Sequence, residues 1–198
     1  MKIEEATALL TNKIKGFLAL PAENQKALAE YYTSVYILAN KELNLEFNNK
    51  DSFHASIVMS SIFEKSNKSL QFFSGSFKGD ICDQPLYLDA LKTALNKDIT
   101  IDIIFENNPN ADSECYKLLK NTINSKAKIS VSKIDSKYLT NVRDLNIKLH
   151  HFLIGDDKMF RYEFDGDSYQ AYCNFDDKES VKILQKNFDV MKSNSISI

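Results

Sequence analysis

The sequence predicts an α/β domain with a mostly parallel sheet, preceded by a pair of helices. Three observations support this prediction. Apolar residues recur at helical spacing in the first part of the chain, short apolar strands then alternate with amphipathic helices, and a later stretch alternates with a period of two. Strands that alternate with helices are typical of βαβ units, whereas a period-two stretch with a tight turn predicts a β-hairpin.

The composition is that of an ordinary globular protein. Of 198 residues, 43% are hydrophobic and 26% are charged, which is enough apolar content for one domain with an accessory helical segment. The formal net charge of -2 predicts no strong global attraction to nucleic acid or to an anionic membrane, although a local basic groove is compatible with it. The sequence has no apolar run close to the roughly 18–20 residues of a membrane span.

The number and spacing of the cysteines predict a protein that resides in a reducing compartment. Cys82, Cys115 and Cys173 are odd in number, widely spaced, and form no metal-ligand pattern with the histidines. We therefore expect free thiols in a cytoplasmic protein, with neither a metal nor a cofactor. The acidic start of the chain, Met1–Glu5, lacks the apolar segment of a secretory signal.

Two helices are predicted at the N-terminus. The first covers residues 3–18, and the second begins near Pro21 and runs to about Asn44. The second helix has a broad, tyrosine-rich apolar stripe, which we interpret as core or as a contact surface for a dimer or another protein. The predicted organisation is an N-terminal helical segment (1–47), an α/β domain (48–192) and a frayed tail (193–198).

The elements of the α/β domain follow in order. After a polar break at 48–51, Asp51 or Ser52 caps a helix in which His54 is expected to be a structural histidine. Asp176 or Asp177 caps the last helix. Helices are predicted over 53–66, 85–96, 112–124 and 178–191, strands over 70–73, 99–105, 128–134 and 169–173, and a covering loop over 135–147.

The stretch 148–163 carries the strongest candidate site. It predicts two strands joined by a Gly-Asp-Asp turn, with His151 on one face of the first strand and with Arg161 and Glu163 together on the second. A base or nucleophile, a cation and a carboxylate on one sheet surface predict an anion-handling site with catalytic potential. The alternative is a solvated Arg–Glu pair beside a structural histidine.

Polar side chains also follow two strands of the predicted parallel sheet. Ser74 and Ser76 come after the strand 70–73, and Glu106 and Asn107 come after the strand 99–105. Ligands of such sheets bind beyond the carboxyl ends of the strands. The predicted ligand-binding residues are Ser74, Ser76, Glu106, Asn107, Asp156 and Asn174.

Several of these segments together resemble the phospholipase D superfamily, which carries an H-x-K-x4-D motif. The resemblance covers roughly residues 51–191. It depends on Ser56-Ile57-Val58 before the strand Leu70–Phe73, on Ser74-Gly75-Ser76-Phe77-Lys78-Gly79, on Glu106-Asn107, and on His151-Phe152-Leu153-Ile154-Gly155-Asp156-Asp157-Lys158. It implies a mixed sheet flanked by helices. It also implies two motifs that meet, in one chain or in a dimer, where one histidine attacks phosphorus, the lysines bind phosphate and the second histidine protonates the leaving group.

This sequence departs from the family motif. If Asp156 is the motif aspartate, His151 stands at the lysine position and Leu149 at the histidine position. Arg161 and Glu163 lie where the family has a serine or asparagine. Only Asp156 therefore carries over from the motif.

Three hypotheses follow. The first is a dimeric phospholipase D-like module that binds a phosphate ligand or a partner without standard catalysis. The second is a metal-independent phosphodiesterase, favoured as a nuclease, in which Glu163 orients a nucleophilic His151, Arg161 holds phosphate, and a second His151 in a homodimer is the general acid. The third is a protein-interaction component that uses the N-terminal helices. The ligand stays open among lipid, DNA, RNA and a small phosphodiester.

Overall fold

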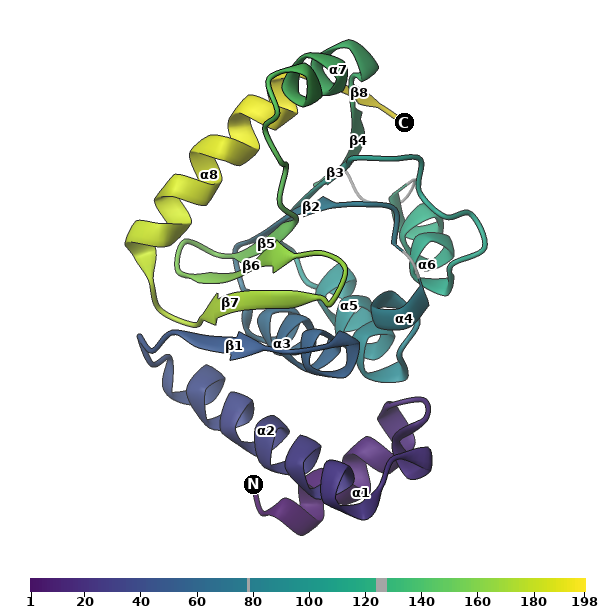
Figure 1. The fold of residues 1–198 in the computed structure, drawn as a ribbon, viewed down its shortest axis with the longest axis vertical. Helices are drawn as coiled ribbons and strands as arrows, with labels where there is room; N and C mark the ends of the chain where they lie inside the picture. The colour runs from purple at the N-terminus through teal and green to yellow at the C-terminus, as the bar shows by residue number, and fades with distance from the viewer. Residues whose placement is uncertain (78, 124–127) are drawn as a thin grey trace.

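The computed structural model describes residues 1–77, 79–123 and 128–198. Within these residues the chain forms one mixed sheet of eight strands, in the order β1-β7-β6-β5-β2-β3-β4-β8 (Figure 1). The three parallel strands are β2 (Ser69–Ser74), β3 (Thr100–Phe105) and β4 (Ile129–Ile134). The predicted α/β class and the mixed sheet implied by the family resemblance are confirmed. The expectation of a mostly parallel sheet is wrong, because two of the seven strand pairs in the described residues are parallel and five are antiparallel.

The remaining strands are antiparallel to their neighbours. They are β5 (Phe152–Gly155), β6 (Met159–Asp165), β7 (Gln170–Asn174), β1 (Phe47–Asn49) and β8 (Ser195–Ser197). The predicted hairpin is β5–β6, although its first strand begins only at Phe152. His150 and His151 therefore lie in the chain that leads into β5.

Helices cover both faces of the sheet (Figure 1). One face carries α3 (Ser52–Lys65), α4 (Gly79–Cys82), α5 (Pro85–Asn96) and α6 (Glu114–Ile123), and the other carries α8 (Lys178–Ser193). Asp51 caps α3 by accepting a hydrogen bond from the His54 amide, and Asp177 caps α8. The predicted end of α6, residue 124, lies outside the described residues.

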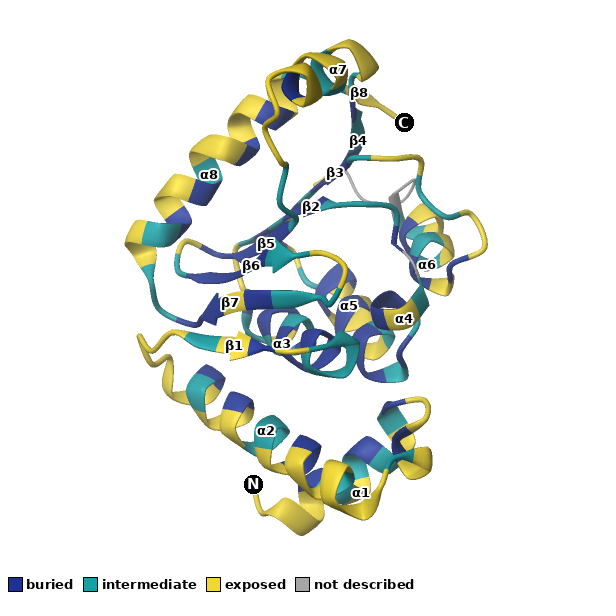
Figure 2. Cartoon of the chain, in the orientation of Figure 1, coloured by how far each residue is buried: buried dark blue, intermediate teal, exposed yellow. Residues whose placement is uncertain are grey.

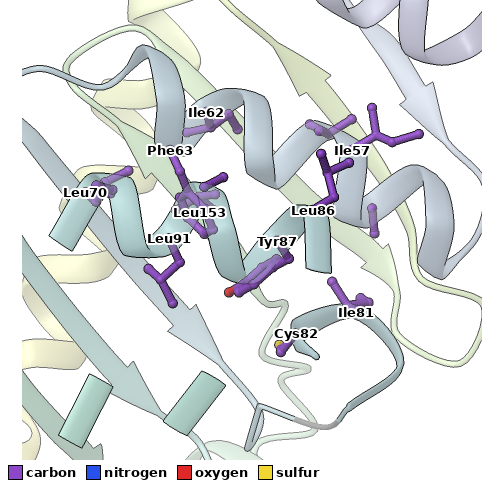
Figure 3. Close-up of a cluster of buried hydrophobic side chains, with 14 of the residues drawn as sticks. Ile57, Ile62, Phe63, Leu70, Ile81, Cys82, Leu86, Tyr87, Leu91 and Leu153 are labelled. Atoms are coloured by element: carbon purple, nitrogen blue, oxygen red, sulfur yellow. The ribbon is translucent and has the colours of Figure 1, made fainter. Parts of the chain in front are cut away.

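The core has two parts because the side chains of the central strands alternate between the faces. Leu70 and Phe72 of β2 belong to the larger cluster under α3 and α5, whereas Phe73 belongs to a smaller cluster under α8. Tyr87 is fully buried in the larger cluster and meets the ring of Phe63 edge-on at 5.0 Å (Figure 3). Figure 2 shows α8 buried along the stripe that faces the sheet and exposed on its outer side.

The N-terminal helices α1 (Ile3–Lys13) and α2 (Ala22–Lys41) lie at one end of the molecule (Figure 1). Helix α2 packs beside α3, and α1 packs on α2 and α5. The first helix is shorter than predicted because Gly16 takes a left-handed φ of 84° and a short 3-10 turn, Phe17–Ala19, follows. The buried side of α2 joins the larger core cluster. The 47/48 boundary falls inside β1, which pairs with β7 where the sequence predicts a polar break, so the division into domains stays a prediction.

Two segments differ from the predictions. Residues 135–147 contain the helix α7 (Ser136–Asp144), which begins where the Asp135 carboxylate accepts hydrogen bonds from two backbone amides. Residues 195–197, predicted as part of a frayed tail, form β8 because α8 returns the chain to the free edge of β4. Within the described residues, no helix combines the length and the apolar character that a membrane crossing requires.

Candidate functional site

The candidate site lies where the carboxyl ends of β2 and β3 meet the start of β5. The Glu163 amide donates a hydrogen bond to the His151 carbonyl at 2.9 Å, which places these two residues opposite each other in the hairpin. Their side chains meet, with Nδ1 of His151 3.1 Å from Oε1 of Glu163. Glu106, the first residue after β3, places Oε2 3.1 Å from Nε2 of the same ring. The structure thus brings together His151, Glu163 and Glu106.

The two contacts determine the charge of His151. A carboxylate accepts hydrogen bonds but donates none, so each ring nitrogen that faces one carries a proton. Burial lowers the pKa of His151, but the hydrogen bonds to Glu106 and Glu163 outweigh burial and raise that pKa to about 9. The hydrogen bond from His151 lowers the pKa of Glu106. Burial raises the pKa of Glu163, but the hydrogen bond from His151 and the nearby Arg161 outweigh burial and lower that pKa overall. At neutral pH His151 is therefore a cation between two carboxylates.

Arg161 of β6 lies on the same sheet face as Glu163 but is only 3% exposed. Its Nε donates to the Asn49 side chain at 2.8 Å, and a terminal nitrogen donates to Glu163 and to the Tyr169 carbonyl at 2.9 Å each. The side-chain amide of Asn49 also donates a hydrogen bond to the Tyr169 carbonyl, and this bond connects β1 to the cluster. Protein groups accept hydrogen bonds from the Nε and from one terminal nitrogen of Arg161, which also lines the cavity beside His151. Its role in binding phosphate oxygens therefore stays a prediction.

A cavity of about 240 Å³ opens beside His151 at the ends of β2 and β3. The predicted residues Ser74, Ser76 and Asn107 line it. The chain approaches the ring closely at Gly75, where an added Cβ would lie 3.1 Å from Cε1 of His151. We call this space the β2 cavity. Lys78, part of the segment that resembles the family, lies outside the described residues.

A second cavity, of about 300 Å³, lies against α7 and is also lined by His151. We call it the α7 cavity. Arg143 and Lys148 line it, and the guanidinium of Arg143 is 3.5 Å from Glu106. Its apolar lining is Leu139, Val142, Ile147 and Leu149. Because residues 135–147 are predicted as a loop, the sequence alone does not place Arg143 at the site; the spacing of Leu139 and Val142 on one helical face is the signal for α7.

Asp156 lies away from this site, contrary to its predicted role. Its carboxylate accepts hydrogen bonds from the backbone amides of Asn67, Lys68 and Ser69, at 2.8 to 3.2 Å. These amides precede or begin β2, at the end opposite Ser74. Asp156 therefore fixes the entry into β2, which supports a structural role in place of the predicted ligand role.

Asn174 is also at the wrong end of the sheet for a ligand. It pairs with Phe160, near the start of β6, whereas Glu163 is near the end of that strand. Its side chain donates to Asn44 and accepts from the Asp176 amide, at 2.9 Å each. Each of the neighbouring pairs β2–β5, β5–β6 and β6–β7 is antiparallel, so β7 runs opposite to β2 and β3. The carboxyl end of β7 therefore lies at the other edge of the sheet from the carboxyl ends of β2 and β3.

No metal site accompanies these groups: across residues 1–77, 79–123 and 128–198, no set of three or more His, Cys, Asp or Glu side chains is placed to hold an ion. Glu106, His151 and Glu163 do meet, but the protonated ring lies between the two carboxylates and fills the position of a cation.

No protein-family model matches the sequence, and no curated protein matches it. Solved structures do match. The archaeal chromatin protein TrmBL2, whose structure shows a novel mode of DNA binding, is 12% identical with a TM-score of 0.56, over 89% of this chain and 63% of that one. This chain thus spans less than two thirds of the length of TrmBL2.

Two shorter structures match along their whole length. The phospholipase D family member Nuc from Salmonella typhimurium is 12% identical with a TM-score of 0.55, over 78% of this chain and 99% of Nuc. NucT from Helicobacter pylori is 14% identical with a TM-score of 0.52, over 78% of this chain and 100% of NucT. At this level of identity the likeness concerns the fold. The chain has the phospholipase D-like fold.

Proposed function

We propose that this chain is a phospholipase D-like domain that binds a phosphate-bearing ligand without cleaving it. One observation carries the proposal: both ring nitrogens of His151 lie 3.1 Å from carboxylate oxygens. A histidine nucleophile needs a ring nitrogen with a free electron pair, and an imidazolium has none. A protonated ring is suited to hold an anion instead.

The surroundings of His151 support a phosphate ligand. Arg143 and Lys148 add positive charge from the α7 cavity, and Ser74, Ser76 and Asn107 place hydroxyl and amide groups in the β2 cavity. Such groups donate hydrogen bonds to phosphate oxygens, and the bonds are stronger where the donor is charged. The fold shared with a DNA-binding chromatin protein and with Nuc supports a phosphodiester, nucleic acid included, as the ligand class.

A second candidate function is a metal-independent phosphodiesterase. The contact between Nδ1 of His151 and Glu163 favours it, because a nucleophilic imidazole needs such an acceptor to orient the ring. This function requires Glu106 to leave Nε2, the ring to lose a proton, and a second protomer to supply its own His151 as general acid.

A turnover assay combined with a binding titration separates the two candidates. We would measure cleavage of bis-p-nitrophenyl phosphate and of single-stranded DNA in EDTA, and binding of inorganic phosphate by NMR. The proteins are the wild type, His151→Gln and the control His54→Gln, whose histidine instead contacts Asp51 at 2.7 Å.

We expect no cleavage by any of the three proteins, and phosphate binding at least about tenfold weaker in His151→Gln alone, the cost of one charged hydrogen bond. Cleavage by the wild type that disappears in His151→Gln would establish the second candidate instead. A wild type that neither cleaves nor binds phosphate would contradict the proposal.

The homodimer, a protein partner at the N-terminal helices and a cytoplasmic location also remain proposals. The mass in solution, measured by light scattering, tests the first. A partner complex would depend on α2, where Tyr36 and Ile37 are exposed.

A further inference from the structure

The two carboxylates that hold His151 are anchored very differently. The Glu163 side chain is 8% exposed and also accepts a hydrogen bond from Arg161 at 2.9 Å. Glu106 is 19% exposed, and its second cation, Arg143, is 3.5 Å away and itself mostly exposed. Of the two, Glu106 is therefore the carboxylate that a ligand displaces at lower cost.

The backbone of Glu106 is held independently of its side chain. Its amide donates to the Ser74 carbonyl at 2.8 Å, and the Asn107 amide donates to the Gly75 carbonyl at 3.0 Å. The side chain can therefore rotate out toward solvent while the ends of β2 and β3 stay joined.

The geometry of Glu106 is that of a bound anion. Oε2 faces Nε2 of His151 at 3.1 Å, and Oε1 faces a terminal nitrogen of Arg143 at 3.5 Å. Two oxygens on one centre, shared between an imidazolium and a guanidinium, are also what a phosphate group presents.

We propose that Glu106 is an internal ligand, and that the phosphate of an amphipathic phosphate ester replaces its carboxylate on His151 and Arg143 while the apolar part of the ester enters the α7 cavity. This inference rests on the proposed function and specifies its ligand: a phosphate group joined to a compact apolar body.

The α7 cavity suits such a body in size and lining. It adjoins Glu106 and His151, and Leu139, Val142, Ile147 and Leu149 supply the apolar surface. An apolar cavity of about 150 Å³ is enough to bind benzene, so about 300 Å³ accommodates a phenyl ring beside the phosphate. Lys148, which lines the same cavity, adds a cation near the phosphate.

The experiment compares the binding of two probes, inorganic phosphate and phenyl phosphate, by calorimetry. It is run at about pH 6, because His151 is largely protonated there even if its pKa is close to the ordinary value for histidine. The variants are Glu106→Gln, Ile147→Ser and the control Glu114→Gln. Glu114 is a surface glutamate of α6 paired with Lys117. Ile147 is 53% exposed, so its replacement leaves the core intact. Thermal unfolding of each variant confirms that it is folded.

We expect Glu106→Gln to bind both probes at least about tenfold more tightly than the wild type, because a neutral amide competes poorly for two cations. Ile147→Ser should weaken phenyl phosphate severalfold and leave inorganic phosphate unchanged. Glu114→Gln should match the wild type with both probes.

Each part of the inference has its own contrary result. If the wild type binds phosphate and Glu106→Gln binds it no better, the role of Glu106 is wrong and the proposed function stands. If Ile147→Ser leaves the binding of phenyl phosphate unchanged, or weakens both probes equally, the α7 cavity does not hold the apolar part. If the wild type binds neither probe, the proposed function itself fails.

Discussion

The guanidinium of Arg161 donates a hydrogen bond to the Glu163 carboxylate at 2.9 Å, and both side chains are buried. The two residues lie two positions apart on one face of β6, and Nε of Arg161 donates a hydrogen bond to the Asn49 side chain. It fixes the carboxylate that orients His151. Arg161 is therefore a positioning residue whose charge keeps Glu163 ionised.

Replacement of Arg161 by Met should destabilise the fold by about 3–5 kcal/mol, because it removes the buried cation that, together with the His151 ring, balances the Glu163 carboxylate. Urea denaturation of the variant and the wild type measures this difference. Arg143→Met, which removes an exposed cation, should change the free energy of unfolding by less than about 0.5 kcal/mol. Equal stability of Arg161→Met and the wild type would show that the pair does not hold the hairpin.

The ring of His151 should titrate with a midpoint near pH 9, which its NMR signals report directly. Because the pKa is about 9 in the folded state and about 6.5 in the unfolded state, protonation stabilises the fold fully below about pH 6.5. This contribution, up to about 3 kcal/mol, is lost as the pH rises through 9. Unfolding free energies from pH 6 to pH 10 should therefore fall in the wild type more than in His151→Gln. A midpoint near 6.5 would mean that the two carboxylates do not hold the ring in solution.

Asp156→Asn should destabilise the fold by about 1–3 kcal/mol without altering phosphate binding. Its carboxylate accepts from three backbone amides, and an amide oxygen is a weaker acceptor. Asparagine tolerates the left-handed φ of 54° at this position, so the turn itself is preserved. Denaturation and the phosphate titration, run beside the exposed Asp157→Asn, measure both effects. Loss of binding at unchanged stability would restore a ligand role for Asp156.

Gly155→Ala should destabilise the fold by about 1–3 kcal/mol, because the added methyl group overpacks the contact between α3 and β5. A Cβ at Gly155 would lie 2.6 Å from both Ile62 Cγ2 and Ser66 Oγ. The matched control is Gly166→Ala, where the nearest atom within contact range is the Glu163 side chain at 3.5 Å. Thermal unfolding should show a lower midpoint for Gly155→Ala alone. Similar midpoints for the two variants would mean that α3 and β5 do not approach this closely.

Local patterns predict most of the elements correctly. Apolar periodicity places α3, α5 and the parallel strands to within a few residues, and Asp51 and Asp177 mark the starts of their helices because capping depends only on neighbouring amides. The period of two in 148–163 places Arg161 and Glu163 on one face. The helix α7 is missed because its nine residues are mostly polar.

The sequence by itself determined the α/β class, the hairpin and the meeting of His151 with Glu163, since each depends on residues that are close along the chain or opposite in one hairpin. Only the tertiary structure decided that Glu106, 45 residues before His151, occupies the other side of its ring, and that Asn49 reaches Arg161 across 112 residues. It also decided that Asp156 and Asn174 lie at the far end of the sheet. The physical reason is strand order and direction: the antiparallel hairpin packs beside a parallel β2–β3 pair, and which ends coincide follows from that packing.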